Sequence, residues 1–95
     1  MEAKLTDDEW QVFEHWRVTL GHPRAVASPE RKRLIAKWLP TYGVDRLMAA
    51  VSGCRKSPHH MGQNDRHQRY DSLELILRDA KHIEMFEALV RQGAA

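Results

Sequence analysis

The stretch TDDEWQVFEHWRVTLG, residues 6–21, indicates a helical fold because it contains the main sequence signals of an amphipathic helix. Thr6 followed three residues later by Glu9 is the pattern of a capping box at a helix start. Gly21 is a typical helix stop. Between these signals, apolar residues recur at helical spacing: Phe13, Trp16 and Leu20. The stretch therefore predicts a helix that buries this face, with Trp10 at its edge and partly exposed.

Two further helices are predicted in the middle of the chain. In SPERKRLIAKWLP, Ser28 is a favourable cap and Pro29 occupies the first helical position, so a helix is expected to begin there and to end at Pro40. The stretch YGVDRLMAAVSGC, residues 42–54, has apolar residues at positions i, i+3, i+4 and i+7 of a helix. It predicts a third, shorter helix that ends at Gly53.

The last helical stretch is YDSLELILRDAKHIEMFEALVRQG, residues 70–93. Asp71 or Ser72 is suited to cap its beginning. Apolar residues form one stripe before Asp79 and a second stripe after it, and Asp79 is itself a favourable cap. We therefore expect a break or kink near Asp79.

These elements predict an all-α fold, a compact bundle of four to five short helices with one long basic loop, because no stretch alternates like a strand. Ninety-five residues form a single domain, residues 1–95, with its core at about 6–91. No apolar run approaches the ~20 residues that span a bilayer, and no signal peptide is visible. The single cysteine, Cys54, excludes an internal disulfide, which fits a cytoplasmic protein.

The predicted basic loop, residues 55–69, holds the excess positive charge of the chain. Its only apolar side chains are Pro58 and Met61. Its net charge is +3, which leaves −1 for the remaining 80 residues out of a total of +2. A loop of this length is usually functional or disordered. A local cationic patch indicates phosphate, nucleic acid or an acidic protein surface as the partner.

We expect the loop to be ordered and to form the binding surface. Ser57-Pro58 and Gly62 supply turn chemistry, and Asn64 is suited to bond nearby backbone groups. The predicted binding residues are Arg55, Lys56, His59, His60, Asn64, Arg66, His67 and Arg69. A possible secondary patch comprises Arg31, Arg33 and Lys37, with Trp10 as an aromatic contact for a partner. Tyr42 or Tyr70 can stack a base, although we favour Tyr70 as a buried residue where the loop rejoins the core.

Catalysis and metal binding are not indicated. Cys54, His59, His60 and His67 lie within fourteen residues, but their spacing matches no standard zinc site and a second cysteine is absent. Packing or hydrogen bonding is the favoured role for these histidines. The chain contains no nucleophile-elbow, metalloprotease, phosphate-loop or dinucleotide motif. We therefore predict a protein that is not an enzyme, with no cofactor and no metal.

Two stretches carry a family resemblance. VFEHWRVTLGHPRA, residues 12–25, and LMAAVSGCRKSPHHMGQNDRHQRYDSLELILRDAKHIEMFEAL, residues 47–89, resemble the helical domain at the C-terminal end of replication proteins from bacteriophages and prophages. The resemblance covers nearly the whole chain. The matching residues are Phe13, Trp16 and Arg17; His22, Pro23 and Arg24; Gly53 and Cys54; Ser57 and Pro58; Gly62 and Asn64; Tyr70 and Asp71; and Leu75, Ile76, Leu77 and Arg78.

The resemblance implies a role in phage DNA replication inside a bacterial host, without catalysis. In that role the domain holds origin DNA or contacts the replicative helicase or its loader. The sequence comprises this domain alone, either as a cut-out fragment or as a free-standing small protein, and we expect the stand-alone protein. The alternative is a small phage-encoded inhibitor of a host nucleic-acid machine, of the anti-CRISPR type, which binds a protein target such as a CRISPR effector. The two differ in salt dependence, because phosphate contacts weaken steeply with ionic strength.

Overall fold

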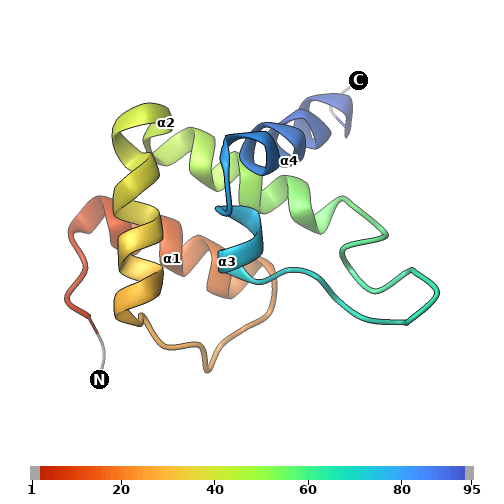
Figure 1. The fold of residues 1–95 in the computed structure, drawn as a ribbon, viewed down its shortest axis with the longest axis horizontal. Helices are drawn as coiled ribbons and strands as arrows, with labels where there is room; N and C mark the ends of the chain where they lie inside the picture. The colour runs from red at the N-terminus through yellow and green to blue at the C-terminus, as the bar shows by residue number, and fades with distance from the viewer. Residues whose placement is uncertain (1–2, 94–95) are drawn as a thin grey trace.

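The computed structural model describes residues 3–93, and this part of the chain is mostly helical (Figure 1). It forms four helices: α1 (Asp7–Thr19), α2 (Pro29–Arg55), α3 (Leu73–Ile76) and α4 (Ala80–Gly93). Within these residues there is no strand, and a single isolated bridge pairs Met61 with Arg69. The all-α prediction is confirmed. No helix in the described range is long and apolar enough to cross a membrane.

Helix α1 begins at the predicted capping box. The Glu9 carboxylate accepts a hydrogen bond from the Thr6 amide at 2.9 Å, and the Thr6 hydroxyl accepts one from the Glu9 amide at 3.2 Å. Glu9 also accepts a bond of 2.6 Å from the ammonium group of Lys32, which ties the start of α1 to α2. Its apolar face is buried as predicted, and Trp10 at the edge is 48% exposed.

Helix α2 is interrupted at Gly43 rather than at Pro40, which corrects the predicted end of the second helix. Pro40 lies inside α2 on an exposed position, where its ring is tolerated close to the end of the first helical segment. Gly43 has φ +79° and ψ 170°, a conformation that glycine adopts without the steric penalty of a β-carbon. The chain turns there, and α2 continues to Arg55 (Figure 1).

The predicted helix end at Gly53 is also wrong, because Gly53 lies inside α2 where α4 packs against it. A β-carbon at Gly53 would lie 2.5 Å from the carbonyl carbon of Phe86 and closer still to its oxygen. The missing side chain thus allows the two helix backbones to touch. Phe86 is itself fully buried.

The break near Asp79 is confirmed. Ser72 caps the short helix α3 by accepting a hydrogen bond from the Leu75 amide at 3.1 Å. Asp79 then accepts a bond of 2.8 Å from the His82 amide at the start of α4. The separate caps let α3 and α4 take different directions (Figure 1).

We predict that Gly53→Ala lowers the free energy of unfolding by at least about 2 kcal/mol, because the added methyl group collides with backbone that cannot rotate away. Gly43→Ala is the matched control. It meets no atom within 4 Å and costs only the backbone strain of φ +79° and ψ 170°, about 1–3 kcal/mol. Urea denaturation measures both. A loss below about 1 kcal/mol for Gly53→Ala would contradict the backbone contact.

Candidate functional site

The polar segment between α2 and α3 begins at Lys56, because Arg55 is the last residue of α2. This corrects the predicted start of the loop by one residue. The amides of Lys56 and Ser57 donate to the carbonyls of Gly53 and Cys54, at 3.0 and 3.1 Å. These bonds close the last turn of the helix. The segment then extends away from the helices and returns to α3 (Figure 1). We call residues 56–69 the basic loop.

Asn64 is the hydrogen-bonding centre of the basic loop. Its side-chain amide donates to the carbonyls of His59 and Gln68, each at 2.7 Å. Its side-chain oxygen accepts bonds from the amides of Arg66 and Gln68, at 3.1 and 3.2 Å. The whole side chain is therefore occupied within the loop, in agreement with the predicted local bonding. Of the predicted binding residues, Asn64 holds the shape of the loop and has no group left for a partner.

The base of the loop is held against α4 through His60. The imidazole Nδ1 lies 2.7 Å from the hydroxyl oxygen of Ser57, which is buried. The ring packs edge-on against Phe86, with 4.8 Å between ring centroids. The His60 carbonyl accepts a bond from the Tyr70 amide at 2.7 Å, which joins the two ends of the loop. His60 is thus half-buried and faces the core.

Arg55 and Arg69 connect the loop to the C-terminal end of α1. Arg55 donates to the Thr19 carbonyl and Arg69 donates to the Leu20 carbonyl, each at 2.7 Å. The last carbonyls of a helix have no partner within it and attract positive charge. Arg69 also pairs with the buried carboxylate of Asp71 at 2.5 Å. Both guanidinium groups therefore cap α1, while their charge remains at the surface.

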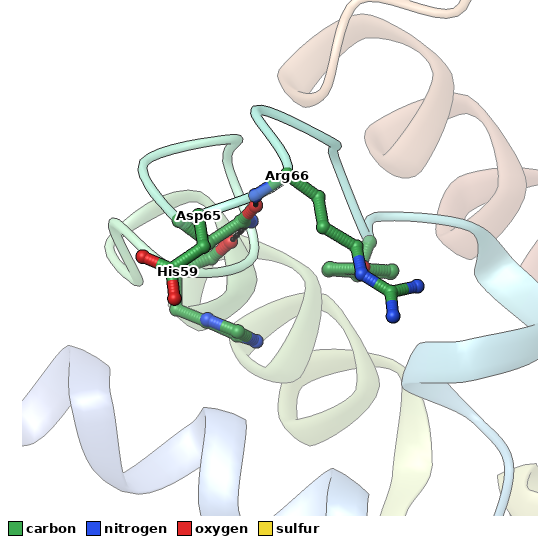
Figure 2. A pocket seen from close by; sticks show the side chains of 5 residues that line it. His59, Asp65 and Arg66 are labelled. Carbon is green, nitrogen blue, oxygen red and sulfur yellow. Dashed lines mark hydrogen bonds between the residues drawn. The ribbon is translucent and has the colours of Figure 1, made fainter.

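Lys56 and Arg66 are exposed cationic side chains of the loop that form no ion pair within residues 3–93, and the exposed rings of His59 and His67 form none either. His67 has φ +50°, a left-handed conformation that is uncommon for a residue other than glycine. Figure 2 shows the guanidinium group of Arg66 and the carboxylate of Asp65 on opposite sides of the pocket. Arg66 is therefore not neutralised by its acidic neighbour.

A pocket of about 310 Å³ lies beside Arg66 (Figure 2). Its lining residues are His59, Asn64, Asp65, Arg66 and Tyr70. The rings of His59 and Tyr70 stack with their centroids 5.6 Å apart and their planes at 21°. Tyr70 is half-buried and not fully enclosed, so part of its surface is available to the pocket.

The basic side chains of the predicted secondary patch each contact a neighbouring residue, although Arg33 and Trp10 remain exposed. The guanidinium carbon of Arg31 lies 5.0 Å from the centroid of the Trp16 ring. The ammonium group of Lys37 lies 4.9 Å from the Trp38 ring centroid. Arg33 pairs with Glu30 at 3.7 Å. The first segment of α2, which carries the three basic residues of this patch, lies far from the tip of the basic loop (Figure 1). The structure does not bring this patch and the loop together.

Cys54 lies fully buried beside the loop, and its thiol lies 3.9 Å from the Tyr70 carbonyl. Burial, together with the negative charge of Asp71, raises the pKa of the Cys54 thiol to about 12. The thiol is therefore protonated at neutral pH and is unsuited to nucleophilic attack. No group of three or more potential metal ligands lies together in the described part of the chain.

Two histidines have a lowered pKa. Burial lowers the pKa of His60, and the charges of His59 and His82 add to the effect. Burial also lowers the pKa of His15, whose Nε2 lies 2.8 Å from the Ser52 hydroxyl. The fold thus favours the neutral form of both rings.

The sequence did not identify Asp65 as part of the site, and it favoured Tyr70 as a buried residue. The one signal in the sequence was position, because Asp65 precedes Arg66 and Tyr70 follows the last residue of the loop.

No family model, curated protein or solved structure matches the chain. The resemblance to phage replication domains therefore stays a prediction that rests on the quoted motifs.

We predict that Asn64→Ala loosens the loop without unfolding the helices. The amides of Arg66 and Gln68 lose the side-chain oxygen that they bond, so their hydrogen exchange is expected to accelerate by about tenfold or more. Exchange detected by NMR measures this effect. Gln63→Ala, an exposed neighbour, is the control and leaves both amides protected. Unchanged exchange in Asn64→Ala would show that other contacts order the loop.

We predict that acid destabilises the protein through His60. Its pKa is lower in the folded chain than its ordinary value of 6.5, so the unfolded chain binds the proton more tightly. The free energy of unfolding therefore falls as the pH drops below about 6.5, until the folded His60 is also protonated. Urea denaturation between about pH 5 and 7.5 measures the slope. His60→Asn is expected to reduce the slope to the part that His15 contributes, whereas His67→Asn, on an exposed position, leaves it unchanged. An unaltered slope in His60→Asn would refute the assignment.

Proposed function

We propose that this chain is a non-enzymatic binding module, linked to phage DNA replication, that contacts DNA through the basic loop. The observation that carries the proposal is the ordered loop that presents Lys56 and Arg66 without ion-pair partners among residues 3–93. Phosphate contacts from Lys and Arg supply most of the sequence-independent affinity for DNA. The cytoplasm of a bacterial host is the compartment that this role requires.

The order of the loop supports the proposal. Asn64 fixes the loop with four hydrogen bonds, and His60 fixes its base against α4. A surface that is already ordered loses little conformational entropy when a ligand binds. The same cations on a disordered loop would bind phosphates more weakly, because each contact would also have to order the backbone.

Arg55 supports the same surface through its electric field. It donates to the end of α1 and forms no ion pair among residues 3–93, so its positive charge remains beside the loop, whereas Asp71 offsets the charge of Arg69. A cluster of like charges at one end of a nearly neutral domain attracts a polyanion and orients it before contact. The motif resemblance links this contact to replication, with the replicative helicase or its loader as the associated protein partner.

A second candidate function is inhibition of a host nucleic-acid machine by direct protein binding, of the anti-CRISPR type. The observation that favours it is the exposure of large apolar side chains on α1, with Trp10 48% and Val18 68% exposed. Aromatic side chains are frequent energetic centres of protein interfaces. In this role the basic loop would contact an acidic groove of a protein such as a CRISPR effector.

We predict that Lys56→Glu combined with Arg66→Glu lowers the affinity for DNA by at least about tenfold and makes it less dependent on salt, because two phosphate contacts are lost. Fluorescence anisotropy with labelled single- and double-stranded DNA at low and moderate salt measures both effects. The control is Arg78→Glu combined with Lys81→Glu. This pair changes the charge equally on exposed positions outside the loop.

Equal losses in both double variants would show that binding follows net charge and not the loop. Absence of binding to any DNA at low salt would overturn the proposal and favour the protein-inhibitor function. Circular dichroism of both variants establishes that they keep the helical fold.

A further inference from the structure

We propose that the pocket beside Arg66 binds one unpaired nucleobase that carries an exocyclic amino group, so that the preferred ligand is single-stranded DNA. The inference rests on the proposed DNA-binding function and adds a ligand class and a base preference to it. The pocket volume of about 310 Å³ lies at the small end of the range for ligand sites.

The aromatic wall of the pocket is suited to stacking. His59 is exposed and stacks on Tyr70, with 5.6 Å between ring centroids. The rings of His59 and His60 also meet nearly at a right angle, with centroids 5.1 Å apart and planes at 86°. His60 is fixed in turn by Ser57, so the wall keeps its position without a ligand. Unpaired bases stack on such rings, whereas the paired bases of a duplex are covered by their neighbours.

The charged groups of the pocket are Asp65 and Arg66, and neither forms an ion pair within residues 3–93. Asn64 also lines the pocket, but its side chain is occupied by the loop backbone. Asp65 forms no ion pair within residues 3–93 and is exposed. In Figure 2 its carboxylate and the guanidinium group of Arg66 point to different sides, so a ligand meets an acceptor on one side and a cation on the other.

This arrangement fits a nucleotide better than a duplex backbone. A carboxylate within a purely phosphate-binding surface repels its ligand. It becomes favourable when the ligand brings a hydrogen-bond donor, and an ionised carboxylate accepts only. We assign Asp65 to the base edge and Arg66 to the adjoining phosphate.

The carboxylate also predicts which bases bind. Cytosine, adenine and guanine each present an amino group, which donates to a carboxylate. Thymine has no amino group, and its one donor, the ring N3–H, lies between two carbonyl oxygens that repel Asp65. The pocket is therefore expected to prefer cytosine over thymine, two pyrimidines of similar size.

The test compares labelled oligo-dC, oligo-dT and a duplex, each of about 12 nucleotides per strand, by fluorescence anisotropy at one moderate salt concentration. We expect the wild-type chain to bind oligo-dC at least about fivefold more tightly than oligo-dT, and the duplex less tightly than oligo-dC. Asp65→Asn is expected to remove the preference, because an amide donates as well as accepts. If Asp65 acted only through its charge, this variant would strengthen binding to all three ligands equally.

His59→Ala distinguishes the contribution of stacking to the DNA affinity from that of charge. His59 is exposed, and its removal leaves the cations Lys56 and Arg66 in place. It is expected to weaken binding to both single strands and to leave duplex binding unchanged. Equal binding of oligo-dC and oligo-dT, or duplex binding as tight as that of oligo-dC, overturns the base pocket. If the Lys56→Glu and Arg66→Glu pair still weakens duplex binding in that case, the proposed function survives alone. Absence of binding to all three ligands overturns both.

Discussion

The contact between the backbones of α2 and α4 at Gly53 is the constraint on which the rest of the structure depends. Because Gly53 has no side chain, the Phe86 backbone lies directly against it. The Phe86 ring then lies under His60, and His60 lies against Ser57. The shape of the loop thus follows from the closeness of two helices. A larger residue at Gly53 would move α4 outward and remove the support from the base of the loop.

The positive charge of the loop is divided between two tasks. Arg55 and Arg69 satisfy carbonyl groups that α1 leaves open at its end, and Arg69 also compensates the buried Asp71. Lys56 and Arg66 have no such partners among the described residues. The first pair holds the loop against the helices, and the second pair is presented to solvent. Charge counted from the sequence alone does not distinguish these tasks, because all four residues contribute equally to the net charge.

The histidines of the loop are divided in a similar way. His60 is half-buried against Phe86, and its environment favours the neutral ring. His59 lies on the outer side of His60 and stacks on Tyr70. The inner ring therefore serves stability and the outer ring lines the pocket. Two adjacent identical residues take different roles because the turn at residues 58–60 directs their side chains to different neighbours.

The sequence by itself determined the helices, their caps and the position of the charged loop. The capping box of Thr6 and Glu9, the cap at Ser28 and the break near Asp79 depend on contacts within a few residues, so local patterns predict them. The local order around Asn64 was predicted for the same reason.

The tertiary structure decided the features that depend on residues far apart in the chain. Gly53 was predicted to end a helix, because a glycine near an apolar stripe usually does, but its role is set by Phe86, thirty-three residues later. Pro40 was also expected to end a helix, yet the turn occurs at Gly43. The use of Arg55 and Arg69 as caps for α1, and the pocket beside Asp65, likewise required distant segments to meet. Local spacing contains no information on such contacts, since burial and electrostatic partners arise only when the chain is folded.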